Sequence, residues 1–333
     1  MLSASGARLA TTETERRYWQ RLRECDSAEQ SAFMLVMSAS ADMPVYYETQ
    51  RSQVAYYDRE ETEMNTCENL KHSILQTAAP GRSYEEISTF WSTRSDNYSN
   101  CVREELATNR PEAWRKQILA QVPKEGPLRV LDAGCGPGFF TILLHQAGHA
   151  VTGVDGSEGM LAHARENARA LSLEPEFLQM DCRRLRFAEN TFDLILCRNV
   201  THIFENHAQV YGEWKRVLKP GGVLLIFDAN WHLPYVEGPV RAEAIYREAE
   251  CFRQYGSNFS GDDCPYEYIG SSLQPANYRA LGDLRRPDFD MGVLLGLGYR
   301  EVHIDRDVTG ELWSEKEKLM YGATPLFMVR AVK

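Results

Sequence analysis

The sequence lacks several features that mark membrane, secreted and nucleic-acid-binding proteins. No apolar run among its 333 residues approaches the ~20 residues that a membrane-spanning helix needs. Residues 1–17 are polar and contain no apolar core of a signal peptide. The formal net charge is −10, so the basic surplus typical of nucleic-acid binding is missing. These absences predict a protein with no membrane span and no nucleic-acid partner.

The cysteines form no recognisable framework. The eight cysteines are scattered, without a C-x-x-C pair, and three of them (Cys135, Cys182 and Cys197) fall in expected core strands or turns. This pattern is typical of reduced thiols and predicts a cytoplasmic protein without a structural metal site. The composition, 43% hydrophobic and 25% charged, is that of an ordinary folded chain.

The chain is organised around residues 128–140, which read Leu-Arg-Val-Leu-Asp-Ala-Gly-Cys-Gly-Pro-Gly-Phe-Phe. The pattern predicts a short buried strand, a turn containing Gly134, Gly136 and Gly138, and a helix that begins at Phe139. A strand, a glycine turn and a helix form the first half of a nucleotide-binding βαβ unit. The glycines tolerate positive φ and let a ligand approach the backbone closely.

The spacing of this loop indicates the kind of nucleotide. A dinucleotide fingerprint, G-x-G-x-x-G, would need a third glycine where Phe139 stands, and the third glycine here comes one residue early. A second expected strand, residues 150–154, ends in Asp155, which lies 21 residues after Gly134. That distance suits a carboxylate that binds ribose hydroxyls. Loop and acid together favour a nucleoside ligand over a nicotinamide dinucleotide.

These segments resemble the class I S-adenosylmethionine-dependent methyltransferases, and most closely the type 11 or ubiquinone/menaquinone methyltransferase-like group. Five stretches are similar to that family's motifs in the family's order: residues 132–138, 154–161, 179–182, 190–197 and 218–228. The resemblance implies an α/β fold, a doubly wound seven-stranded Rossmann-like sheet with an antiparallel last strand. Residues 300–305 and 326–332 fit its closing antiparallel pair.

The resemblance also implies S-adenosylmethionine as cofactor and a set of residues that bind it. Asp155 would bind the ribose, Asp181 the adenine amino group, and Asp132 would organise the loop and reach the methionine amino group through water. Tyr98 would close over the sulfonium, which an aromatic face attracts, and Met160 would touch the adenine. Core packing or a plain loop position is the alternative for Tyr98, Met160 and Asp181. The complete expected set is Tyr98, Asp132, Gly134, Cys135, Gly136, Gly138, Asp155, Gly156, Met160, Asp181, Cys182 and Arg198.

The methyl acceptor is expected at the end of the fourth strand, residues 192–197. Ligands of doubly wound sheets lie beyond the carboxyl ends of the strands, and this strand opens into residues 198–202. His202 is the candidate general base because the pKa of a histidine is near neutrality. Arg198 and Asn199 would orient the acceptor, and Tyr235, at the exit of the fifth strand, is a further candidate. A structural role as hydrogen-bonding or strand-capping residues is the alternative for all of them.

Two segments lie outside the motifs. Residues 1–82 are predicted to form a helical extension, either a cap on the main domain or a substrate-specificity lid, and a contact with a second subunit in a homodimer stays open. The methyltransferase domain would occupy residues 83–333. Within it, residues 229–290 are expected as an insertion that acts as a lid or binding wall. It includes a helix over residues 240–255, with surface packing or a dimer contact as the alternative.

Three functions remain open. The first is methyl transfer to a small-molecule acceptor by in-line displacement. The second is a protein methyltransferase that uses the N-terminal helices for recognition, because Cys-Arg-Asn-Val at residues 197–200 resembles a segment of the chemotaxis-type protein-glutamate methyltransferases. The third is a non-catalytic S-adenosylmethionine-binding protein. The sequence specifies neither the acceptor atom nor whether a base is used.

Overall fold

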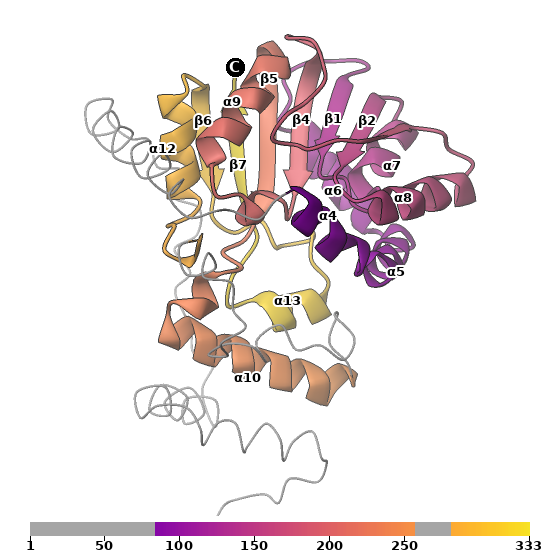
Figure 1. The fold of residues 1–333 in the computed structure, drawn as a ribbon. Helices are drawn as coiled ribbons and strands as arrows, with labels where there is room; N and C mark the ends of the chain where they lie inside the picture. Colours follow the sequence, from indigo (N-terminus) through magenta and orange to yellow (C-terminus); the bar gives the residue numbers. More distant parts are fainter. Residues whose placement is uncertain (1–83, 257–280) are drawn as a thin grey trace, which may run out of the picture.

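A computed structural model describes residues 84–256 and 281–333, which build a seven-stranded sheet with helices on both faces (Figure 1). The strands are β1 (Arg129–Ala133), β2 (Ala150–Asp155), β3 (Glu176–Gln179), β4 (Phe192–Arg198), β5 (Leu218–Asp228), β6 (Arg300–Asp305) and β7 (Phe327–Val332). Their order is β3-β2-β1-β4-β5-β7-β6. Neighbours among β1 to β5 pair in parallel, whereas β7 pairs antiparallel with both β5 and β6. The predicted doubly wound sheet with its antiparallel closing strand is confirmed.

The helices follow the expected alternation with the strands. They are α4 (Tyr84–Ser92), α5 (Ser95–Leu106), α6 (Arg110–Leu119), α7 (Phe139–Gln146), α8 (Glu158–Ala170), α9 (His207–Val217), α10 (Gly238–Tyr255), α12 (Asp288–Gly296) and α13 (Glu315–Tyr321). Two short 3-10 turns are η2 (Thr201–Ile203) and η3 (Leu233–Tyr235). Ser157 caps α8 as its position suggests, because its hydroxyl accepts a hydrogen bond from the main-chain N–H of Met160 at 3.1 Å. The sequence analysis did not anticipate α12 and α13.

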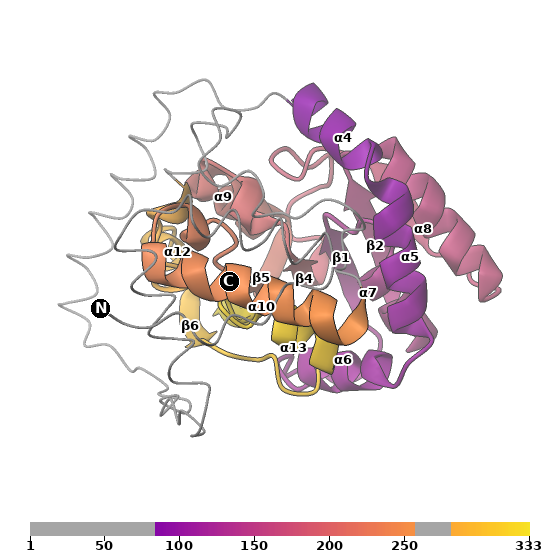
Figure 2. The ribbon, with the colours of Figure 1, turned by 90° about the horizontal axis from the view of Figure 1, so that it is seen from below.

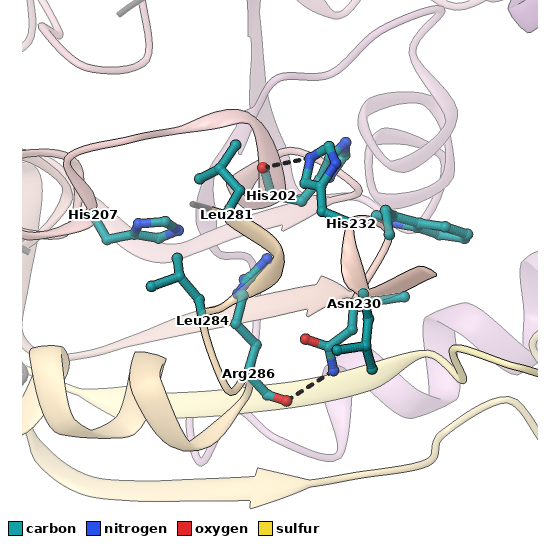
Figure 3. A pocket seen from close by; sticks show the side chains of 10 residues that line it. His202, His207, Asn230, His232, Leu281, Leu284 and Arg286 are labelled. Atoms are coloured by element: carbon teal, nitrogen blue, oxygen red, sulfur yellow. Dashed lines mark hydrogen bonds between the residues drawn. The ribbon is translucent and has the colours of Figure 1, made fainter. Parts of the chain in front are cut away.

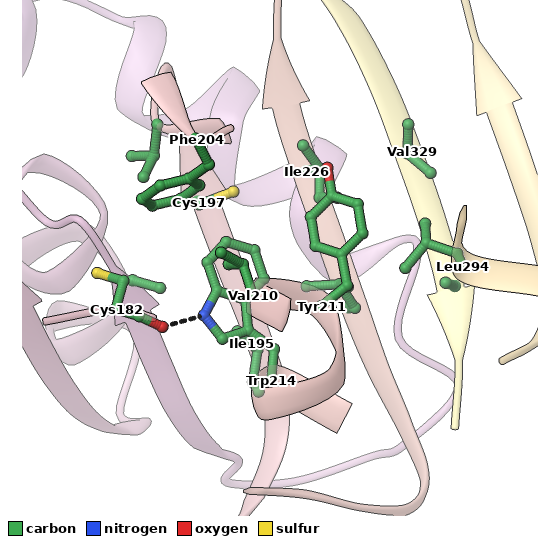
Figure 4. Packing of buried hydrophobic residues seen from close by; sticks show 14 of the residues in the cluster. Cys182, Ile195, Cys197, Phe204, Val210, Tyr211, Trp214, Ile226, Leu294 and Val329 are labelled. Atoms are coloured by element: carbon green, nitrogen blue, oxygen red, sulfur yellow. Dashed lines mark hydrogen bonds between the residues drawn. The ribbon is translucent and has the colours of Figure 1, made fainter. Parts of the chain in front are cut away.

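Strand β4 is buried on both faces, as a central parallel strand should be. Ile195 and Cys197 face the core formed with α9 and α12, whereas Leu194 and Leu196 face the core formed with α6 and α7. Figure 4 shows the first core, where Trp214 of α9 lies over the sheet and donates from Nε1 to the carbonyl of Cys182 at 2.9 Å. That bond satisfies the indole N–H in a fully buried position.

The parallel strands bring their carboxyl ends to one edge of the sheet. Ala133 pairs with Val154 in the β1–β2 register, and Arg198 pairs with Phe227 in the β4–β5 register. The last residues of β1, β2, β4 and β5 therefore lie side by side. Figures 1 and 2 place α10 and α13 beyond this edge, where they pack against each other.

Some expectations fall on residues that are not described. The helical extension at residues 1–82 and its boundary lie outside the described residues, as does the middle of the 229–290 insertion, residues 257–280. The described part of that insertion contains η3 and α10 and leads into α12. Within residues 84–256 and 281–333, no helix is both long and apolar enough to cross a membrane.

Candidate active site at the carboxyl edge of the sheet

The glycine loop between β1 and α7 is held against β2. Gly134, Gly136 and Gly138 have φ of 75°, 51° and 91°, a region that favours glycine. The main-chain N–H groups of Gly134 and Cys135 both donate to the carbonyl of Val154, at 2.8 and 2.9 Å. A Cβ on Gly136 would meet nothing within 4 Å, so this side of the loop is open. A ligand can therefore approach the backbone there.

Asp132 organises the junction of loop and helix, as expected. Its Oδ2 accepts hydrogen bonds from the N–H and the hydroxyl of Thr141, at 2.9 and 2.7 Å. Burial raises the pKa of the carboxyl to about 6, against the opposing effect of the Thr141 bonds. Asn167 of α8 fixes the other side of the loop, because its Nδ2 donates to the carbonyl of Pro137 at 3.1 Å. The role of Asp132 toward the methionine amino group stays a prediction.

Asp155, at the end of β2, presents a preoriented carboxylate beside the loop. Its Oδ2 accepts from the N–H of Gly136 at 2.9 Å, and its Oδ1 accepts from the N–H of Ser157 at 2.8 Å. Burial raises the pKa of this carboxyl, and the main-chain N–H groups lower it. A carboxylate offers about four lone-pair positions, so two remain to accept hydroxyl donors. These remaining acceptor positions therefore fit the hydroxyl groups of a ribose.

Tyr84 of α4 is a wall residue of this site that the sequence analysis missed. Its hydroxyl donates to the carbonyl of Gly156 at 3.1 Å, and Ser88 and Gln179 donate to the same oxygen at 2.9 and 3.1 Å. Burial, then the charges of Asp181 and Asp155, raise the pKa of Tyr84. The phenol therefore stays protonated beside both carboxylates. The region contains several aromatic residues, and the resemblance pointed to Tyr98 as the one beside the cofactor.

The other cofactor candidates have varied surroundings. Tyr98 is 46% exposed, and its ring lies edge-on to Trp91 with centroids 5.4 Å apart. Met160 is buried. Nε of Arg183 donates to both carboxylate oxygens of Asp181, each at 3.0 Å. An adenine amino group would therefore share this carboxylate with the guanidinium of Arg183. The proposed contacts of Tyr98, Met160 and Asp181 with a cofactor stay predictions.

Cys135 lies within the glycine loop and Cys182 follows Asp181, and both thiols are buried. Burial raises the pKa of both thiols, and the nearby carboxylates add to the effect. Both groups therefore stay protonated and act as small apolar side chains.

Arg198 places a fixed cation at the end of β4. Its NH1 pairs with Oε1 of Glu105 at 2.9 Å, and its guanidinium lies 4.5 Å from the ring centroid of Phe139. The next residue, Asn199, is exposed and has φ of 56°, which asparagine tolerates better than most residues. Arg198 is thus anchored to α5 and α7, and the side chain of Asn199 is available at the edge.

His202 forms a pair with Asp228, the last residue of β5. Oδ1 of Asp228 lies 3.1 Å from Nδ1 of His202, and Oδ2 accepts from the N–H of His202 at 2.8 Å. Burial raises the pKa of Asp228, but the charges of His202 and Arg286 and its hydrogen bonds outweigh burial and leave the pKa below its usual range. An ionised carboxylate only accepts hydrogen bonds, so Nδ1 carries the hydrogen. No residue of the described part of the chain hydrogen-bonds to Nε2 of His202.

A small cavity opens beside this pair (Figure 3). Its lining includes three imidazoles, Arg286, Leu281 and Leu284. Nε2 of His232 lies 3.2 Å from the carbonyl oxygen of His202. The ring centroid of Tyr235 lies 6.0 Å from that of His232. Burial, then the charge of His202, lower the pKa of His232 to about 3, so its ring stays neutral. His232 thus contacts both His202 and Tyr235. Arg198 and Asn199 lie at the end of β4, the strand that leads into η2.

Comparison with known proteins finds methyltransferases. Residues 131–226 match the family model described as "Methyltransferase domain". The chain is 28% identical over 219 residues to the ubiquinone/menaquinone biosynthesis C-methyltransferase of Desulfotalea psychrophila, covering 62% of this chain and 80% of that protein. It is 36% identical over 133 residues to the phosphatidylethanolamine N-methyltransferase of Cereibacter sphaeroides, covering 39% and 63%. It is 33% identical over 117 residues to the demethylmenaquinone methyltransferase of Thermus thermophilus, covering 34% and 53%.

The fold and the site define a Rossmann-like methyltransferase core, and the matched residues contain its glycine loop and second acidic strand end. Residues 131–226 belong to the methyltransferase domain family, whose cofactor is S-adenosylmethionine. The chain spans less than two-thirds of the length of the second and third relatives above.

Proposed function

We propose that this protein transfers a methyl group from S-adenosylmethionine to a small-molecule acceptor whose reacting group gives a proton to His202. The observation that carries the proposal is the pairing of His202 with Asp228 at the edge that also holds the glycine loop and Asp155. Nε2 of His202 is left to take a proton, and the cavity beside it has polar and apolar walls.

The cofactor site is proposed from the residues that the edge gathers. The loop backbone at Gly134, Gly136 and Gly138 would hold the methionine end, and Asp155 would bind the ribose. Asp181 would accept from the adenine amino group. When bound, S-adenosylmethionine supplies a methyl group that is already activated as a sulfonium. The chain then has to align the acceptor and exclude water, and alignment can contribute up to ~7–11 kcal/mol to a well-oriented reaction.

His202 would act on the acceptor and Asp228 on His202. As the acceptor reacts, its proton moves to Nε2, and the positive imidazolium is stabilised by the ionised carboxylate at 3.1 Å from Nδ1. A positioned base of this kind typically contributes ~10²–10⁴ in rate. Asn199 and Tyr235 would orient a polar acceptor from either side of the base.

Part of the 229–290 insertion would form the acceptor wall. Trp231 and Tyr235 come directly after β5, and the ring centroid of Trp231 lies 6.4 Å from that of His202. The alternative of a protein acceptor rests on residues 197–200, but the arginine of that segment is already paired with Glu105 inside the chain. A small acceptor fits that arrangement better.

The test uses methyl-labelled S-adenosylmethionine and the purified full chain. The labelled cofactor is incubated separately with the small-molecule fraction and with the desalted protein fraction of a cell extract. We expect label in the small-molecule fraction and its loss in the His202→Gln variant. Label on a protein band, or equal transfer by His202→Gln, would overturn the proposal.

A further inference from the structure

Arg286 lies behind the catalytic pair, on the side of Asp228 that faces away from Nδ1 of His202. Its side chain is 3% exposed. NH1 donates to Oδ2 of Asp228 at 3.1 Å, and NH2 donates to the hydroxyl of Thr201 at 2.5 Å. That hydroxyl in turn donates to Oδ2 of Asp228 at 2.7 Å. Oδ2 of Asp228 therefore accepts from the guanidinium, whereas Oδ1 faces the imidazole and also accepts from Nε1 of Trp231 at 3.0 Å.

Asp290, in the first turn of α12, fixes the guanidinium from the other side. Nε and NH2 of Arg286 donate to its two oxygens, at 2.8 and 3.2 Å. Asp290 is fully buried and also accepts a hydrogen bond from the hydroxyl of Tyr211. Arg286 is thus shared between two buried carboxylates, and only one of them touches His202.

We infer that Arg286 and Asp290 are positioning residues that set the proton affinity of His202 through Asp228. The carboxylate of Asp228 attracts the proton of an imidazolium, and Arg286 offsets part of that attraction because it pairs with the same carboxylate. Asp290 in turn draws the guanidinium away from Asp228. The inference rests on the proposed function for its catalytic meaning, since a base is useful only near the working pH. Its electrostatic content depends only on the contacts above.

Within residues 84–256 and 281–333, few other charged groups face His202. The titratable and charged groups that face it or its partner Asp228 from the packed elements are Cys197 of β4, His232 and Tyr235 after β5, His207 and Tyr211 of α9, and Arg286 and Asp290. Burial lowers the pKa of Arg286, but the charges of Asp290 and Asp228 outweigh burial and raise the pKa above its usual value. The guanidinium therefore stays charged. His232 stays neutral. Among the described residues, Arg286 and Asp290 therefore carry opposite charges next to Asp228 that substitutions can remove one at a time.

Opposite shifts are expected for the two substitutions. In Arg286→Gln, Asp228 acts on His202 alone and Asp290 loses its cation, so the midpoint of His202 titration rises, by about one pH unit. In Asp290→Asn, the guanidinium acts more fully on Asp228, so the midpoint falls. Arg286→Lys keeps the charge and is expected to stay nearest to the wild type. The double variant Arg286→Gln/Asp290→Asn removes both charges and should lie between the two single variants.

The experiment follows the imidazole resonance of His202 by NMR across pH in the ligand-free full chain, with His202→Gln to assign the signal. Circular dichroism checks that each variant is folded. If Arg286→Gln alone does not fold, the double variant is compared with Asp290→Asn, and its midpoint should be the higher of the two; an equal or lower midpoint would overturn the inference. Midpoints that move in opposite directions in Arg286→Gln and Asp290→Asn support the inference. Midpoints that match the wild type, or move in the same direction, would overturn it. Since no acceptor is used, failure here is distinct from failure of methyl transfer.

Discussion

Nδ1 of His202 and Oδ1 of Asp228 are 3.1 Å apart, and the main-chain N–H of the same histidine reaches the other oxygen of the carboxylate at 2.8 Å. The two contacts fix both the position of the backbone and the direction of the ring. Asp228 ends β5, and His202 lies in η2 after β4. The pairing therefore follows from the parallel register of β4 and β5, which places the two strand ends side by side.

Replacing His202 with Gln should lower methyl transfer and leave cofactor binding intact. The amide keeps a donor toward Asp228 but cannot take up a proton, so the rate should fall by ~10²–10⁴ if the acceptor must lose one. The readout is transfer of labelled methyl to the small-molecule fraction, together with the calorimetric Kd for S-adenosylmethionine.

A matched control is His163→Gln. His163 pairs with Asp96 on the outer side of α8, away from the carboxyl edge of β4 and β5. The His163→Gln variant should transfer methyl groups at the wild-type rate. Unchanged transfer in His202→Gln would remove the general base from the mechanism, and a weakened Kd would reassign His202 to cofactor binding.

Asp155→Ala should weaken binding of S-adenosylmethionine at least tenfold. The substitution removes the two acceptor positions proposed for the ribose hydroxyls and also frees the N–H of Gly136 that orders the loop. Isothermal titration calorimetry measures the Kd. Asp193→Ala is the control, because Asp193 pairs with Lys124 and Lys219 at the start of β4, away from the carboxyl edge. Equal Kd values for wild type and Asp155→Ala would contradict the ribose assignment.

Sequence reasoning works best where the chemistry is local. Gly134, Asp155 and the strands that end beside them lie within one βαβ unit, so turn and helix preferences fix their relation without knowledge of the rest of the chain. The same holds for the N-cap Ser157. His202 could be placed at the ligand edge because the strand before it reads as a buried parallel strand.

Contacts between distant segments could not be predicted in this way. Arg286 lies 58 residues after Asp228, in a stretch expected only to be a lid or wall. Whether its guanidinium meets Asp228 depends on where α12 docks, and no periodicity in the sequence specifies that. Tyr84 was missed for a related reason, since several aromatics of one helical region compete and only packing selects the one that meets Gly156.

His207→Phe should stabilise the protein more at pH 5 than at pH 7. His207 is fully buried, its ring centroid is 5.1 Å from that of Phe289, and neither nitrogen has a hydrogen-bond partner within the described residues. Burial, then the charge of Arg286, lower its pKa to about 4. An unfolded histidine gains its proton below about pH 6.5. Wild-type stability therefore falls as the pH drops from about 6.5 toward 4, and phenylalanine removes this loss.

The expected size of that effect follows from linkage. Between pH 6.5 and 5 the lost stability amounts to about 2 kcal/mol, because each pH unit in this window contributes roughly 1.4 kcal/mol. Urea unfolding at the two pH values measures it as the difference between variant and wild type. The same stabilisation at both pH values would mean that His207 is already protonated or is partnered in the folded state.

Alanine at Gly134 and at Gly136 should have different consequences. At Gly134 the new Cβ would lie 2.5 Å from Cγ2 of Val200, and φ is 75°. Left-handed backbone costs ~1–2 kcal/mol and overpacking ~1–3 kcal/mol, so Gly134→Ala should lose about 2–5 kcal/mol of unfolding free energy. Val200→Ala in that background should recover the overpacking part alone.

At Gly136 the Cβ meets no atom within 4 Å, so the substitution costs only the backbone part. That open side is where a ligand would approach the loop. Gly136→Ala should therefore stay folded, with a smaller loss of stability than Gly134→Ala, while its Kd for S-adenosylmethionine rises severalfold. Urea unfolding and calorimetry on the two variants separate the effects. If Gly136→Ala binds the cofactor as tightly as the wild type, the ligand does not lie against this face of the loop, and the loop serves only to join β1 to α7.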